Sequence, residues 1–142
     1  MDDIHVTRTL RAVIPLLPVP MTFDQLAINF GTARARPLRI REWPLSHGPL
    51  TALWVKDRDE DFIYYDAGAD PSHQRQGVFH ELGHIAQGHP PTTLQAARSS
   101  PGCPYPAALQ ATAEQFATTL VAIVASGPDG PDELSRAGAV LS

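Results

Sequence analysis

The sequence is poor in cysteine, has no long apolar run and carries few charged residues. Its 142 residues include one cysteine, Cys103, so no disulfide bond can form within the chain. This suits a reducing compartment, and we expect a cytoplasmic protein. The first twenty residues lack the basic and apolar segments of a signal peptide, so none is expected. No run reaches the roughly 18 apolar residues of a membrane span, so we expect no membrane association.

Positive charge is also scarce. The chain has 11 lysine and arginine residues against 15 acidic ones, a net charge of −4. Proteins that bind DNA directly normally present a basic face to the phosphates. Arg34, Arg36, Arg39 and Arg41 do cluster around one expected strand, and we interpret them as its solvated face. Direct binding to nucleic acid is therefore not expected.

The remaining composition is that of a globular protein. Hydrophobic residues make up 43% of the chain, and its length suits one core, so we expect a single domain over residues 1–142. Its core should span about residues 20–125, followed by a loose C-terminal tail at 127–142. Residue periodicity and capping signals predict helices over 4–16, 22–31, 71–87 and 107–125, and strands over 37–45, 51–57 and 61–68.

The order of these elements predicts an α+β fold. A short charged turn joins the second and third strands, which predicts an antiparallel hairpin. We expect a small, mainly antiparallel, three-stranded sheet with the helices packed on one face.

The segment GVFHELGHIAQGH, residues 77–89, contains the candidate metal ligands and the candidate catalytic base. It lies on the expected helix that begins after Asp70 and stops at Gly88. His80 and His84 are four residues apart, so they point the same way and can offer two nitrogens to one Zn²⁺ ion. Glu81 lies about 100° round the helix, near a water on the metal, where its carboxylate can act as the catalytic base.

A plain structural role for these histidines is the alternative. The H-E-x-x-H pattern arises by chance in roughly one chain in a hundred of this composition, and unpartnered histidines among apolar neighbours would be costly. His89 misses the spacing of an extended motif, because position 90 is proline, and we interpret it as a polar cap beyond Gly88. Gly83 costs about 1 kcal/mol of helix stability relative to alanine. Close approach by a strand or substrate would explain it, or the glycine is merely tolerated.

A catalytic zinc site needs a third protein ligand. Glu114 is the only acidic residue on the expected helix 107–125, and it lies beside the apolar stripe of that helix. We predict Glu114 as the third metal ligand. A boundary glutamate that reaches solvent is the alternative reading.

Three stretches resemble the ImmA/IrrE family of small zinc-dependent peptidases: VFHELGHIAQGH, TAEQFATTLV and the preceding hairpin TALWVKDRDEDFIYYDAG. The resemblance covers roughly residues 20–125. It implies a zincin-like fold, zinc held by two histidines and a downstream helical glutamate, and the motif glutamate as base. It also implies a helix-turn-helix repressor as partner. Carried over, His80 and His84 bind the metal and Glu81 faces the water.

The sequence departs from that family at the third ligand. The family pattern E-x-E-A-[N/D/E]-x-F-A corresponds here to QATAEQFA, so Gln110 and Thr112 occupy the two earlier acidic positions. If the first position supplies the ligand, an amide replaces a carboxylate. Otherwise Glu114, one turn from Gln110 on the same stripe, serves after a small helix shift.

Two functions from different classes therefore stand. The first is a zinc metallopeptidase that hydrolyses a peptide bond in a protein partner, such as a repressor or antitoxin. The second is a non-cleaving regulatory module of the same fold that binds a repressor, with zinc structural or absent. Mn²⁺ remains possible, although two imidazoles favour zinc. Tyr64, Tyr65 and His47 are candidate donors to the oxyanion.

Overall fold

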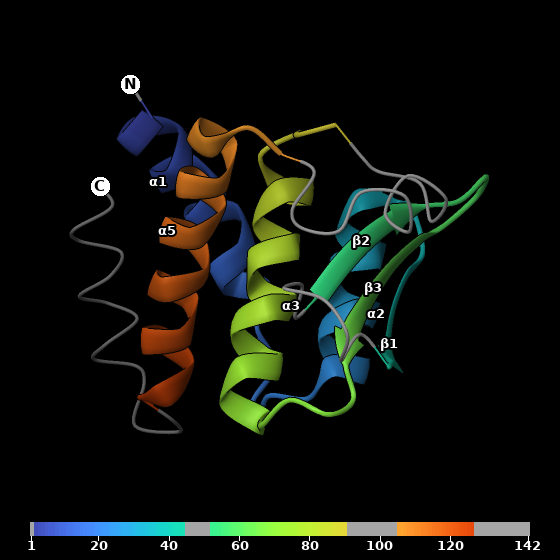
Figure 1. Ribbon diagram of the computed structural model, residues 1–142. Coiled ribbons are helices and arrows are strands. Elements are labelled where there is room, and N and C mark those ends of the chain that lie inside the picture. The colour runs from blue at the N-terminus through green and yellow to red at the C-terminus, as the bar shows by residue number, and fades with distance from the viewer. Residues whose placement is uncertain (1, 45–51, 91–104, 127–142) are drawn as a thin grey trace.

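The computed structural model describes residues 2–44, 52–90 and 105–126, and this part of the chain has an α+β fold (Figure 1). His47, Cys103, the tail 127–142 and most of the loop 90–105, about which the sequence makes predictions, lie outside the described residues. The elements are α1 (Asp2–Val13), the 3-10 turn η1 (Ile14–Leu16), α2 (Phe23–Arg34), β1 (Leu38–Trp43), β2 (Ala52–Lys56), β3 (Asp61–Asp66), α3 (Pro71–Ala86) and α5 (Ala107–Ala125).

The sheet is mixed, with strand order β1-β3-β2. Strands β2 and β3 form the predicted antiparallel hairpin, whose turn is closed by the Asp57 N–H donating to the Glu60 carbonyl at 2.8 Å. Strand β1, however, pairs with β3 in parallel. The expectation of a mainly antiparallel sheet is therefore wrong for this pair. The alternation of buried Leu38 and Ile40 is the same for either strand direction, so it could not reveal the direction.

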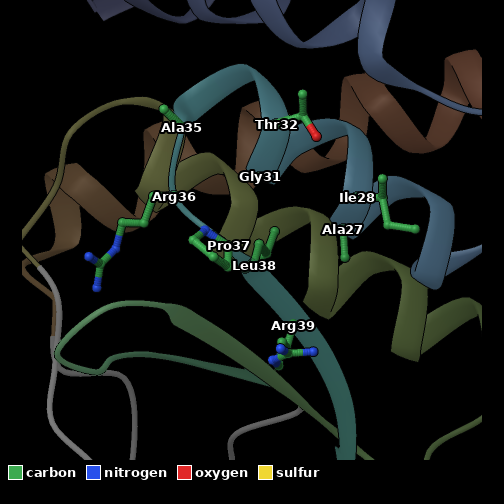
Figure 2. A pocket seen from close by; sticks show the side chains of 9 residues that line it. All are labelled: Ala27, Ile28, Gly31, Thr32, Ala35, Arg36, Pro37, Leu38 and Arg39. Carbon is green, nitrogen blue, oxygen red and sulfur yellow. The ribbon is translucent and has the colours of Figure 1, made fainter.

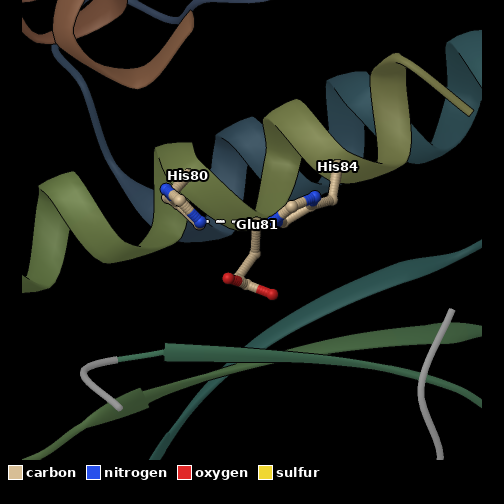
Figure 3. A group of neighbouring side chains, drawn as sticks. All are labelled: His80, Glu81 and His84. Atoms are coloured by element: carbon tan, nitrogen blue, oxygen red, sulfur yellow. Dashed lines mark hydrogen bonds between the residues drawn. The ribbon is translucent and has the colours of Figure 1, made fainter. Parts of the chain in front are cut away.

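The helices cover one face of the sheet, as predicted. Helix α3 lies between α5 and the sheet, and α2 lies on the same side as α3 (Figures 1 and 3). No helix in the described ranges is both long and apolar enough to cross a membrane. The buried residues form one core cluster to which every helix and strand except η1 contributes, including Leu10, Leu26, Phe30, Ile40, Trp54, Ile63, Phe79, Leu82, Phe116 and Leu120.

Helix α2 runs past Gly31, which the sequence suggested as its stop. It continues to Arg34 and ends at Ala35, whose φ of 56° is left-handed. A Cβ atom at Gly31 would lie 3.0 Å from the Leu38 backbone nitrogen, so the glycine allows β1 to begin close to the helix. A pocket opens at this junction of α2 and β1 (Figure 2). Its lining includes no residue of the histidine motif.

A buried carboxylate on β3, that of Asp61, links α2 and the turn after it to β2. Its Oδ2 atom accepts from Arg34 and from Arg36, each at 2.9 Å, and its Oδ1 atom accepts from the Trp54 indole at 3.2 Å. Burial raises the pKa of Asp61, but the hydrogen bonds from Arg34, Trp54 and Arg36 together bring it below its usual value. Two of the four clustered arginines are therefore ion-pair partners of a buried group and not part of a solvated face.

Gly83 lies where α3 contacts α5. A Cβ atom at this position would lie 2.9 Å from Phe116 Cδ1 and 3.3 Å from Ala113 Cα. The close neighbour is therefore helix α5, and not the strand or substrate that the sequence suggested.

Replacing Gly83 with alanine should destabilise the protein. We expect a loss of about 1–3 kcal/mol in the free energy of unfolding, because overpacking outweighs the better helix propensity of alanine. Urea unfolding measures the change. Gly68→Ala is the control, since a Cβ there meets only Asp66 Oδ1 at 3.6 Å, and its effect should stay within about 0.5 kcal/mol. Equal stability of Gly83→Ala and wild type would contradict the tight helix contact.

Candidate metal centre

Helix α3 carries the motif, and both of its ends are fixed locally. The Asp70 side chain accepts from the His73 N–H at 3.0 Å, which caps the first turn as predicted. Gly88, with a φ of 75°, follows the last turn. The His89 N–H then donates to the His84 carbonyl at 2.9 Å, a bond that does not require a histidine at this position. The His89 ring lies against the ring of His84.

The two motif histidines face each other. His80 Nε2 and His84 Nε2 are 3.1 Å apart, and their rings are close to perpendicular (Figure 3). One ligand atom each from His80, Glu81 and His84 lie within 4.8 Å of one another, so this group could hold a metal ion. The i, i+4 spacing therefore brings two imidazole nitrogens to a common point.

Glu81 points from α3 toward the sheet (Figure 3). Its Oε1 atom accepts from the Trp54 backbone N–H at 3.0 Å, so this N–H faces away from β3, at the edge of β2 with which no other described strand pairs. Burial raises the pKa of Glu81 to about 8, while the hydrogen bond from Trp54 acts in the opposite direction. Without a cation nearby, the Glu81 carboxyl group is mostly protonated at neutral pH.

His84 is fully buried and neutral. Burial, and then the neighbouring His80 and His89, lower the pKa of His84 to about 3. Its Nδ1 atom lies 2.8 Å from His89 Nδ1, and the Tyr105 ring stacks on its imidazole with 3.7 Å between ring centroids. A neutral imidazole with one nitrogen engaged by a neighbour presents the other as a ligand. Sequence reasoning missed the Tyr105 contact, because nothing in the spacing connects position 105 to the motif.

The structure places Gln110, and not Glu114, beside the facing nitrogens. Gln110 Oε1 lies 2.6 Å from His80 Nε2, and the Gln110 side chain also hydrogen-bonds His84. Glu114 Oε2 instead lies 2.8 Å from His80 Nδ1, on the other side of the ring, and Gln76 donates to its second oxygen. The Glu114 side chain is 54% exposed. The predicted third ligand is therefore not brought to the point where the histidines converge.

The other candidates lie elsewhere. Tyr64 contacts Trp43 and Phe62 on the face of the sheet opposite the helices, and Tyr65 packs against Phe23. The structure gives neither tyrosine a contact with the histidines. Thr112 uses its hydroxyl to bond the Leu109 carbonyl within α5.

No model of a known protein family matches the sequence, and no curated protein matches it either.

The raised pKa of Glu81 predicts how the stability of the metal-free protein depends on pH. Because its pKa rises from 4.5 to about 8 on folding, the unfolded chain releases this proton first, and stability falls as pH rises across that window. Glu81→Gln removes this titration, while its amide oxygen can still accept from the Trp54 N–H.

In EDTA, we compare the free energy of unfolding of Glu81→Gln with that of wild type. The variant value minus the wild-type value should increase by at least about 1 kcal/mol between pH 5 and pH 8. Urea unfolding at the two pH values measures it. The comparison with wild type cancels the separate titration of His84. An advantage that stays constant with pH would show that Glu81 is not buried as a neutral acid.

Proposed function

We propose that the protein is a zinc-dependent peptidase with a zincin-like site that hydrolyses a peptide bond in a protein partner. One observation carries this proposal: two imidazole nitrogens, His80 Nε2 and His84 Nε2, converge on a buried helix beside the carboxyl group of Glu81. A metal ion and a base are the two components that hydrolysis by such a site requires.

The separation of the nitrogens fits a zinc ion. Tetrahedral zinc with bonds of about 2.0–2.1 Å separates its ligand atoms by roughly 3.3–3.4 Å. The two Nε2 atoms are 3.1 Å apart, so a shift of a few tenths of an ångström would admit the ion.

The partners of the two outer ring nitrogens, Glu114 for His80 and His89 for His84, also suit a cation at the inner nitrogens. A proton on His80 Nδ1, donated to Glu114, leaves a lone pair on Nε2 in the neutral ring. His84 has the same form when its Nδ1–H donates to His89. Two lone pairs and the Gln110 carbonyl oxygen then face one point, which a cation would satisfy. Two imidazoles favour zinc over Mn²⁺ for this position.

In the proposed reaction, the zinc ion and the residues of the protein have separate roles. Zinc, when bound, lowers the pKa of a water molecule and polarises the scissile carbonyl. With such an ion present, Glu81 would be the carboxylate that takes a proton from the water as the water oxygen bonds to the scissile carbonyl carbon. It would return this proton to the amine nitrogen as the C–N bond breaks. The Trp54 N–H holds this carboxylate at the edge of β2.

Strand β2 offers a place for the substrate. It is an edge strand, and because strand residues alternate, the backbone groups of Ala52 and Lys56 face the same edge as the Trp54 N–H. An extended peptide could pair with this edge beside Glu81. The resemblance to repressor-linked peptidases supports a helix-turn-helix repressor or antitoxin in the cytoplasm as substrate.

A non-cleaving binding module is the second candidate, and the position of Gln110 favours it. An amide oxygen is a neutral and weak zinc ligand compared with a carboxylate. A site of this kind could lose its metal while the fold still binds a repressor. Zinc retention and peptide cleavage distinguish the two candidates.

Purified wild-type protein should retain about one zinc ion per chain after dialysis, and His84→Ala should lose it, because one converging nitrogen is removed. Elemental analysis of the dialysed proteins measures the metal. His73→Ala is the matched control, since His73 is a 70% exposed histidine on the same helix, and it should keep its zinc. If His84→Ala and wild type hold equal zinc, the site lies elsewhere.

Glu81→Gln should retain zinc but lower cleavage by about 10² or more, because the amide cannot accept a proton. Mass spectrometry of a proteome-derived peptide library, incubated with zinc-loaded wild type or variant, detects the new termini. Equal cleavage by both proteins would remove Glu81 from the mechanism. Absence of cleavage by zinc-loaded wild type, both in the library and on a co-purified partner, would favour the binding module.

A further inference from the structure

A carboxylate lies on the outer nitrogen of His80. Glu114 Oε2 is 2.8 Å from His80 Nδ1, and the Gln76 amide donates to the other oxygen of the same carboxylate. Gln76 lies one turn before His80 on α3, whereas Glu114 comes from α5. Both oxygens of Glu114 are thus engaged by groups on α3.

This position excludes Glu114 from the point where the imidazoles converge. The two nitrogens of an imidazole point in divergent directions, so a carboxylate on Nδ1 cannot also reach an ion on Nε2. Gln110 Oε1 already lies 2.6 Å from His80 Nε2, on the inner side. To become a ligand, Glu114 would have to leave both His80 Nδ1 and Gln76.

A carboxylate in this outer position has a defined effect on a histidine ligand. It requires a proton on Nδ1, which leaves the lone pair on Nε2, and it fixes the orientation of the ring. It also makes Nε2 a stronger base. Removal of such partners typically costs 10–100-fold in metal affinity.

We propose that Glu114 is a positioning residue: held by Gln76, it fixes His80 in the form that presents Nε2 to the metal, while Gln110 Oε1 occupies the third protein position. The negative charge of Glu114 therefore lies on the far side of His80 and not on a metal ligand. This inference rests on the proposed function only in requiring a metal at His80 and His84.

A plain surface ion pair is the alternative role for Glu114, since its side chain is 54% exposed and exposed pairs contribute little to stability. Such a pair would leave both the metal affinity and the protonation of His80 unchanged. These two quantities therefore decide between the roles.

The first measurement is zinc affinity, by competition with a chromophoric chelator at one pH. Glu114→Ala should raise the Kd for zinc by about 10–100-fold while about one ion still binds. Glu114→Gln should raise it less, because the amide oxygen still accepts from His80 Nδ1–H. Asp59→Ala, which removes an exposed charge in the β2–β3 turn, is the control and should leave the Kd unchanged.

Gln110 is tested in the same titration. Gln110→Glu should lower the Kd for zinc, because it places a carboxylate where the amide oxygen lies. A Gln110→Glu variant with unchanged or weaker binding would overturn the assignment of Gln110 to the third position. Loss of binding in Glu114→Ala as complete as in His84→Ala would make Glu114 a direct ligand and overturn the proposal, as would an unchanged Kd.

The second measurement needs no metal. Long-range ¹H–¹⁵N spectra of the histidine rings in zinc-free protein at pH 8 should show His80 protonated on Nδ1 in wild type and in Glu114→Gln. In Glu114→Ala the proton should move toward Nε2, where Gln110 Oε1 can accept it. The same His80 spectrum in Glu114→Ala as in wild type would overturn the positioning role. If wild type binds no zinc, the proposed function is wrong. The spectra would still show whether Glu114 determines which nitrogen of His80 carries the proton.

Discussion

The close contact between α3 and α5 at Gly83 is the constraint on which the candidate site depends. Without a side chain at this position, Phe116 and Ala113 lie directly against the backbone of α3. His80 comes one turn earlier on α3, and the same helix register sets Gln110 and Glu114 against its two ring nitrogens. A wider separation of the helices would move both residues from His80, although the H-E-x-x-H sequence itself would be unchanged.

The opposite side of the site depends on where β2 lies, and Trp54 connects that strand to two buried acids. Its indole donates to Asp61, and its backbone N–H donates to Glu81. Hydrogen bonds to a charged group such as Asp61 contribute about 1.5–3 kcal/mol each, but the cost of burying the charge offsets much of this. The network around Asp61, which includes Arg34 and Arg36, connects β2 to α2. The position of the Trp54 N–H that holds Glu81 therefore depends on the same residue that Asp61 binds.

Local signals predicted local structure well. The bounds 107–125 of α5, the Asp70 cap and the β2–β3 hairpin were all readable from neighbouring residues. The direction of β1 was not, because its alternation is the same in either direction. The third position of the site was undecided for a related reason: Gln110 and Glu114 share one stripe of α5, and only contacts with another helix determine which meets the inner nitrogen of His80.

The two carboxyl groups of the site have opposite environments, and this difference defines their proposed roles. Glu81 is buried, which raises its pKa and suits a group that exchanges a proton when a cation arrives. Glu114 is half-exposed and bound to His80, which suits a fixed negative charge. Two imidazoles and an amide are all neutral, so an ion held by them would keep its full charge and would strongly lower the pKa of its water. Zinc held by the three neutral histidines of carbonic anhydrase has this effect. The same neutrality weakens binding of the ion. A carboxylate on the far side of His80 opposes that loss by making the imidazole a stronger donor, without occupying a position on the metal.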